Sequence, residues 1–281
     1  MASQAMPIGG YSHSQGLEAA VEAGWVHDEA SVQQWITDVL SFSLESYEVP
    51  CLEDMHNSWR LRLPDDDAVG CLARLRRLND EFLASRETAE LRRATVQMGF
   101  SLRALLAVLP DLPQTLQGTL NSIEEPSLPC VWSGAAAAWC IDPGDSVAGY
   151  LWSWAENQVL VAIKSVPIGQ SAGQRVLLQV GARVAELVER RETHRAGVRI
   201  VGAGVAVLWD DGSRVVEPGK VGEYEDGRDC GDGGDRGDGG DRGHGRDRGD
   251  GGDRGTLSNF TPGLAILSTR HETQYSRLFR S

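Results

Sequence analysis

The segment from Tyr150 to Lys164 constrains the fold of this chain more than any other stretch. Drawn as a helix, it carries apolar side chains on almost every side: Leu151, Trp152, Trp154, Val159, Leu160, Val161 and Ile163. A helix that is hydrophobic all round is usually buried inside a larger protein. The segment is too short, and with Glu156 too polar, to span a bilayer. We therefore predict a buried helix at the centre of an all-α domain.

A helical hairpin is predicted from the residues on the C-terminal side of this segment. Pro167 ends the first helix, because the residue before a proline is pushed out of helical geometry. The next helix has an apolar face formed by Leu177, Val180, Val184, Leu187 and Val188. Asn157 and Gln158 lie within the first helix and need hydrogen-bonding partners if they are buried. We expect those partners on neighbouring helices.

The clearest amphipathic helix begins after Ser85, which we expect to be its N-cap. Its apolar positions recur at steps of four and three: Leu91, Thr95, Met98, Leu102, Leu105 and Leu109. Arg86 and Glu90 are spaced to pair on the opposite, charged face. Together with Glu87 they could instead form an acid–base pair, but a solvated helix face is the favoured interpretation.

Similar patterns predict about seven to ten helices in a single helical-bundle domain. One helix, capped by Asp28 or Ser31, should place a set of apolar side chains on one face: Val32, Trp35, Ile36, Val39 and Phe42. Another should run from Tyr47 to Leu63 with Leu52, Met55 and Trp59 inside. These segments complete the predicted core.

The chain divides into three parts by composition. Residues 1–192 read as the helical domain, and residues 256–281 as a C-terminal helix and tail belonging to it. Between them, residues 193–255 form an insert that starts with a weak β-like stretch, with a hairpin expected around Asp211-Gly212. It ends in a Gly/Asp/Arg repeat of six residues, GDGGDR, from position 231. We expect this repeat to be disordered, because it has almost no apolar surface to bury.

Charge and cysteine content exclude several classes of protein. The net charge is −13, which argues against nucleic-acid binding, since nucleic-acid binders present basic surfaces. The five cysteines, at positions 51, 71, 130, 140 and 230, form no CxxC pair and no even disulfide set. A reducing compartment is the simplest interpretation. With no signal peptide at the start, we expect a cytoplasmic protein.

Motifs for catalysis or metal binding are not found in the sequence. There is no Walker A loop, no HExxH and no GxSxG. The six histidines are scattered, and His271 beside Glu272 is better suited to an interface than to a metal ion, because adjacent helical residues point apart. His13 is interpreted as a hydrogen-bonded turn residue. We therefore predict no catalytic residues, no cofactor and no metal site.

Four blocks of sequence together resemble one family. They are PIGGYSHSQGLEAAVEAGW, SRETAELR, LWSWAENQVLVAIKSVPIGQSAGQR and FTPGLAILSTRHETQYSRLFRS. In this order they resemble the urease accessory protein UreF family, over most of residues 6–192 and 256–281. Residues 193–255 stand where the family ordinarily has a short link.

The resemblance implies a helical, non-enzymatic scaffold. Its implied partners are UreD (also called UreH), the GTPase UreG and apo-urease, into which nickel is inserted with GTP hydrolysis by UreG. It also implies a homodimer within the complex and a C-terminal tail that becomes ordered on UreD. A direct GTPase-activating protein, with Arg277 or Arg280 as an arginine finger, and a nickel carrier are alternatives in the same pathway.

Partner-binding residues are carried over from the matching blocks. In the tail, the candidates for the UreD contact are Arg270, His271, Glu272, Tyr275, Arg277, Leu278, Phe279 and Arg280. Two further groups are assigned to the surface that faces UreD and UreG: Pro7, Gly9, Tyr11, Ser12 and Gln15 in the N-terminal loop, and Lys164, Pro167, Gly169 and Gln170 in the turn of the hairpin.

Overall fold

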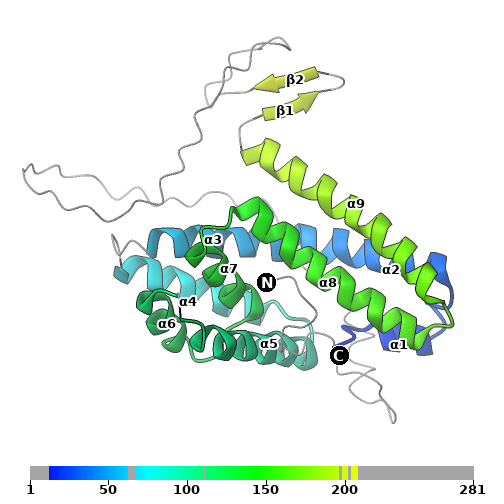
Figure 1. Cartoon of the computed structure of the whole chain (residues 1–281), viewed down its shortest axis with the longest axis horizontal. Helices are drawn as coiled ribbons and strands as arrows, with labels where there is room; N and C mark the ends of the chain where they lie inside the picture. Colours follow the sequence, from blue (N-terminus) through cyan, green and yellow to red (C-terminus); the bar gives the residue numbers. More distant parts are fainter. Residues whose placement is uncertain (1–12, 63–67, 111, 196–197, 202–203, 208–281) are drawn as a thin grey trace, which may run out of the picture. The chain divides into compact units, whose positions relative to one another are not determined.

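The structure is a computed structural model that describes residues 13–62, 68–110, 112–195, 198–201 and 204–207. Within these residues it contains nine α-helices and one π-helical segment, which confirms the predicted all-α fold (Figure 1). The helices are α1 (Leu17–Glu22), α2 (Glu29–Val39), η2 (Leu40–Glu48), α3 (Val49–Arg62), α4 (Ala68–Ala84), α5 (Ala89–Ala107), α6 (Gln114–Asn121), α7 (Leu128–Ala138), α8 (Pro143–Ser165) and α9 (Gln170–Arg195).

The predicted helical hairpin is formed by α8 and α9, which run side by side in opposite directions (Figure 1). The first helix starts earlier than Tyr150, because Pro143 lies in its first turn, where a missing amide hydrogen costs nothing. It ends before Pro167, as predicted. The apolar face of α9 is buried or packed against the core at all five predicted positions.

Ion pairs connect α9 to α2, η2 and α3. Arg175 bonds to Glu29 of α2, and Arg191 bonds to Glu53 of α3, each through two nitrogens. Arg183 and Arg190 both approach the carboxylate of Glu45 in η2. Most of these side chains are partly exposed, so each pair adds little stability, but together they fix the position of α9.

One apolar side chain of the π-helical segment η2 lies outside the core, unlike in the prediction. Val32, Ile36 and Val39 of α2 are buried as predicted, but Phe42 is 65% exposed. Burial continues four residues after Val39, at Ser43, so Phe42 falls at the edge of the apolar face. Ser43 and Leu44 are buried in its place.

The helix predicted after Ser85 begins later than expected. Thr88 is the N-cap of α5, its hydroxyl accepting from the amide of Leu91 at 3.1 Å. Ser85 instead donates to the carbonyl of Phe82 at the end of α4. The apolar seam itself is confirmed, since its first four positions are buried and Leu105 and Leu109 pack against the core.

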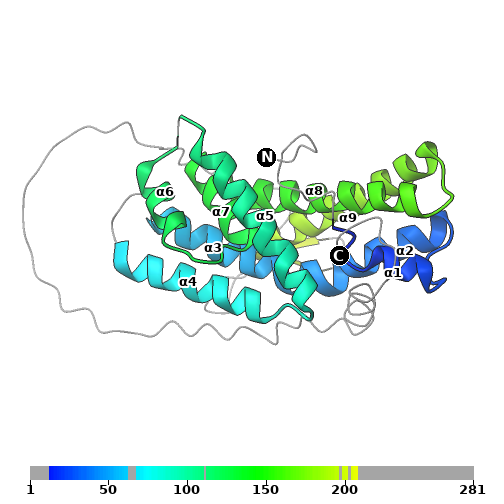
Figure 2. The same cartoon turned by 90° about the horizontal axis from the view of Figure 1, so that it is seen from below.

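Helix α7 lies between α3 and α5, and α4 packs along α3 (Figure 2). Trp59 of α3 is fully buried, and its indole nitrogen donates to the carbonyl of Cys130 in α7 at 3.0 Å. Gly134 lets the two helices approach, because a Cβ there would lie 2.9 Å from the Trp59 ring. Leu52 and Met55 are buried beside it, as predicted.

A second compact unit comprises residues 198–257. Its described part is an antiparallel pair of strands, β1 (Val198–Val201) and β2 (Gly204–Val207), in which Val201 pairs with Gly204. This hairpin closes earlier than the predicted turn at Asp211-Gly212. That turn, the hexad repeat and the C-terminal helix and tail lie outside the described residues. In the described part of the chain, the helices are too short or too polar to cross a bilayer.

Candidate functional site

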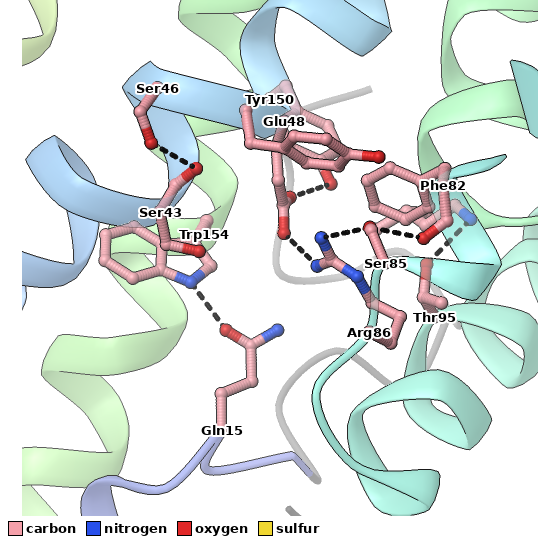
Figure 3. Close-up of polar contacts among 12 residues, drawn as sticks. Gln15, Ser43, Ser46, Glu48, Phe82, Ser85, Arg86, Thr95, Tyr150 and Trp154 are labelled. Atoms are coloured by element: carbon pink, nitrogen blue, oxygen red, sulfur yellow. Dashed lines mark hydrogen bonds and ion pairs between the residues drawn. The ribbon is translucent and has the colours of Figure 1, made fainter. Parts of the chain in front are cut away.

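A buried ion pair joins two helices that are distant in sequence. Arg86, in the link between α4 and α5, donates from Nη1 to Glu48 Oε1 at 2.5 Å. Glu48 ends the π-helical segment η2, and its other oxygen accepts from the Tyr150 hydroxyl of α8 at 3.0 Å. The exposed fractions of the Arg86 and Glu48 side chains are only 7% and 13%. Figure 3 shows the carboxylate between the guanidinium and the phenol.

The arrangement corrects the prediction that Arg86 pairs with Glu90 on a solvated face. The guanidinium carbon of Arg86 lies 4.2 Å from the centroid of the Phe82 ring and 5.9 Å from that of Tyr47, a cation–π arrangement. Glu90 is itself buried. The wide turn of η2 explains part of the error, since it sets the direction of Glu48.

The surroundings of Arg86 and Tyr150 favour the protonated form of both side chains. Burial is the largest influence and by itself would lower the pKa of Arg86, but the charges of Glu48 and Glu87 and the hydrogen bond to Glu48 together outweigh it, so the pKa is raised. Burial, reinforced by the Glu48 carboxylate, raises the pKa of Tyr150 well above its ordinary value. Tyr150 therefore stays a hydrogen-bond donor and Glu48 stays neutralised by Arg86. Both oxygens of the carboxylate accept hydrogen bonds from these two side chains.

The N-terminal loop is held by polar side chains of α8. Trp154 Nε1 donates to Gln15 Oε1 at 2.6 Å, and Asn157 Nδ2 donates to the His13 carbonyl at 3.0 Å. Gln158 Nε2 makes a longer bond to Gln15 at 3.5 Å. The sequence predicts partners on neighbouring helices for Asn157 and Gln158, but the structure places these partners in a loop. Gln15, with a φ of 49°, is in the left-handed region.

A cavity of about 90 Å³ lies between the ion pair and this loop. It is lined by Gln15 of the loop, Ser43, Leu44 and Glu48 of η2, Phe82 of α4, Arg86 before α5, Leu91, Thr95 and Met98 of α5, Trp132 of α7, and Tyr150, Ser153, Trp154 and Asn157 of α8, among others. Three of the lining residues each contain a buried polar atom with no hydrogen-bonding partner among the described residues: Arg86 Nε, Ser153 Oγ and Asn157 Oδ1. The lining of the cavity therefore combines apolar side chains with polar ones.

The turn between α8 and α9 is a separate surface. Lys164, Pro167, Gly169 and Gln170 are all exposed there. Lys164 lies ten residues along α8 from Trp154, which is about 15 Å at the helical rise. The loop at Gln15, which contacts Trp154, and the turn therefore lie at different positions along α8. The remaining predicted residues, Pro7, Gly9, Tyr11, Ser12 and Arg270 to Arg280, lie outside the described residues.

Metal-ligating side chains do not cluster in the part of the chain that the structure describes. It contains no group of three or more His, Cys, Asp or Glu side chains arranged to hold an ion.

Comparison with known proteins decides the family. The family model described as UreF matches residues 26–181, more than half of the chain. The chain belongs to the UreF family. The protein of Dechloromonas aromatica named urease accessory protein UreF is 40% identical over the whole chain and 95% of the relative's length. The UreF protein of an Azoarcus species is 41% identical over 93% of its length, and that of Pseudomonas fluorescens 40% identical over 70% of this chain.

Three of the blocks that resemble UreF meet at the cavity. Gln15 comes from the first block, Arg86 from the second, and Trp154 and Asn157 from the third. The blocks are recognisable in the sequence, but their convergence at one cavity is not. Glu48 was also missed, and the one available signal for it was a carboxylate at the end of an otherwise apolar helical pattern.

Proposed function

We propose that this protein is a non-catalytic accessory factor in the maturation of urease. The observation that carries the proposal is family membership: relatives named urease accessory protein UreF align with the whole chain at about 40% identity. The site supports it, because the buried cluster of Arg86, Glu48 and Tyr150 is internally neutralised. Such a cluster suits a rigid scaffold better than acid–base chemistry.

The finer proposal is a complex with UreD and the GTPase UreG that acts on apo-urease in the cytoplasm. In it, UreG hydrolyses GTP and nickel enters the urease active site, while this chain, as a homodimer, holds the partners together. The tail from Arg270 to Arg280 is proposed to bind UreD, because arginine and aromatic side chains anchor interfaces. The N-terminal loop and the turn at Lys164–Gln170 are proposed to complete the surface.

Two features of the described residues support this assignment of surfaces. The turn residues Lys164, Pro167 and Gly169 are exposed between two long packed helices, so a partner can reach them. The loop at Gln15 is fixed by hydrogen bonds to α8. A fixed loop loses less entropy on binding than a mobile one.

Size-exclusion chromatography of the purified chain with UreD and UreG tests the proposal. We expect one peak containing all three proteins. A chain that elutes alone at micromolar concentrations of both partners would contradict it.

The arginine-finger alternative is separated from the scaffold by Arg280→Ala and Arg277→Ala. A catalytic finger predicts slower GTP hydrolysis by UreG at unchanged binding. The scaffold predicts that binding and hydrolysis fall together. The nickel-carrier alternative is tested by equilibrium dialysis, in which the scaffold predicts no nickel site tighter than micromolar.

A further inference from the structure

The turn from His13 to Gly16 contributes to the wall of the cavity with a backbone that is under strain. Gln15, which lines the cavity, has a φ of 49°, and Gly16 follows with a φ of 86°. Glycine adopts this left-handed conformation freely, but glutamine adopts it at a cost. Such strain persists only where the surrounding structure holds it, and it is concentrated at ligand clamps and switch regions. The turn is therefore a candidate for a moving part.

Side chains of α8 hold the turn in its strained conformation. Trp154 Nε1 donates to Gln15 Oε1 at 2.6 Å (Figure 3), and Asn157 Nδ2 donates to the His13 carbonyl at 3.0 Å. Because the donors are side chains, these bonds can break while the backbone of α8 stays intact. Release of the turn loses hydrogen bonds but relieves the left-handed strain of Gln15, so the two contributions oppose each other.

Movement of the turn does not require the helices to unfold. Leu17 and Ala20 of α1 are fully buried and anchor the chain directly after the turn. Gly16 is the N-cap of α1, and the conformational freedom of glycine makes this position a suitable hinge. The buried side chains within the turn, His13 and Ser14, are polar, so opening exposes little apolar surface. Such segments open at a lower free energy than the whole fold.

We propose that the turn His13–Gly16 is a gate of the cavity, latched by Trp154 and Asn157 of α8. In the latched state it forms part of the cavity wall. In the released state it moves about Gly16 and gives small neutral solutes access to the cavity and to the Arg86–Glu48 pair. The gate is a property of the isolated chain, so it is independent of the proposed partners.

Alkylation of a cysteine placed in the cavity tests the gate. The reporter is Ser43→Cys, because Ser43 lines the cavity and is only 3% exposed. The full chain is treated with iodoacetamide, a small neutral reagent, and the modification of each cysteine is followed by mass spectrometry. In the same chain, exposed Cys140 reports free access and buried Cys130 reports global unfolding. Thr95→Cys is a second reporter, on the α5 side of the cavity.

A gate that opens locally predicts a reporter rate between the rates of Cys140 and Cys130. The reporter rate should hardly depend on urea below the unfolding transition, because local opening exposes little surface. The rate of Cys130 should rise steeply with urea, because this thiol needs global unfolding.

Variants of the latch should accelerate alkylation of the reporter. Gln15→Met removes the acceptor for Trp154 at similar side-chain length, and Asn157→Leu removes the donor to His13. Each variant should speed the reaction about fivefold, the effect of losing one hydrogen bond. The matched control is Gln34→Met, which breaks an exposed bond to Asp38 within α2, and no change is expected for it.

Three results would overturn the proposal. A reporter that reacts as fast as Cys140 shows that the cavity is open without movement of the turn. A reporter that shares the rate and the urea dependence of Cys130 shows that only global unfolding exposes the cavity. Unchanged reporter rates in both Gln15→Met and Asn157→Leu show that the turn does not control access.

Discussion

The pairing of Arg86 shows how a single buried charge depends on the whole fold. Its sequence neighbours offer Glu87 and Glu90, but its partner in the structure is Glu48, 38 residues earlier. An exposed pair at helical spacing gains a few tenths of a kcal/mol. A buried guanidinium needs a carboxylate that is buried with it. Local spacing could not reveal that partner, because the direction of Glu48 depends on the π-helical turn of η2.

Breaking this buried pair should be costly. Arg86→Ala leaves the Glu48 carboxylate buried without its counter-ion, and we expect a loss of about 3–5 kcal/mol in the free energy of unfolding. Urea denaturation monitored by circular dichroism measures it. Arg77→Ala is the matched control, because its pair with Glu81 is exposed, and about 0.5 kcal/mol or less is expected. Equal losses in the two variants would show that Arg86 is not buried with Glu48.

Two buried thiols should make the fold sensitive to alkaline pH. Burial raises the pKa of Cys51 to about 11 and that of Cys130 to about 12. In the unfolded chain the pKa of a thiol is about 8.5. Below that pH the thiols are protonated in both the folded and the unfolded chain, so they do not make the free energy of unfolding depend on pH. Above it only the unfolded chain loses protons, so stability falls by about 1.4 kcal/mol per pH unit for each thiol.

The measurement for the thiols is urea denaturation at pH 8, 9 and 10. Cys130→Ala should make the loss of stability with pH shallower by about 1.4 kcal/mol per unit. Cys140→Ala is the control, because Cys140 is exposed, and its slope should match that of the unchanged chain. An unaltered slope in Cys130→Ala would contradict the burial of this thiol.

Among the helices, periodicity predicted the elements better than their boundaries. The seam of α5 and the apolar face of α9 were predicted because each repeats over several turns. The start of α5 was placed at Ser85 instead of Thr88, since both residues are good N-caps. The exposure of Phe42 was missed because the buried face continues through Ser43, a polar residue, beside it.

Helix α5 approaches the link before α7 so closely at Gly99 that there is no space for a side chain. A Cβ at Gly99 would lie 2.0 Å from the backbone carbonyl oxygen of Pro126, which cannot rotate away. We expect Gly99→Ala to destabilise the fold by about 2–3 kcal/mol. Gly118→Ala in α6 is the control, because no atom of the described residues lies within 4 Å of the added Cβ, and it should stabilise by about 0.5–1 kcal/mol. Both are measured by urea denaturation, and a neutral Gly99→Ala would contradict this packing.

For the whole molecule, the sequence predicted the fold class and the family but not the site. Four blocks resembling UreF were visible in the chain, and the all-α fold agrees with them. The convergence of three of them around one cavity was not predictable, because it depends on how α5, η2 and α8 pack. Hydrogen bonds from Trp154 and Asn157 to the N-terminal loop were missed for the same reason.

Removing the C-terminal tail should separate folding from assembly. Deletion of Arg270–Ser281 is expected to leave the helical circular dichroism signal unchanged and to abolish co-purification with UreD, because the tail is proposed to be the docking segment. An unfolded deletion variant would show that the tail belongs to the core instead.

The most direct measurement is activation of urease with defined components. Apo-urease is incubated with UreD, UreG, GTP and nickel, with and without this chain, and its bound nickel and ureolytic activity are measured. We predict that both rise only when the chain is present, and that they fall back when GTP is omitted. Equal nickel loading and equal activity without the chain would contradict its role in urease maturation.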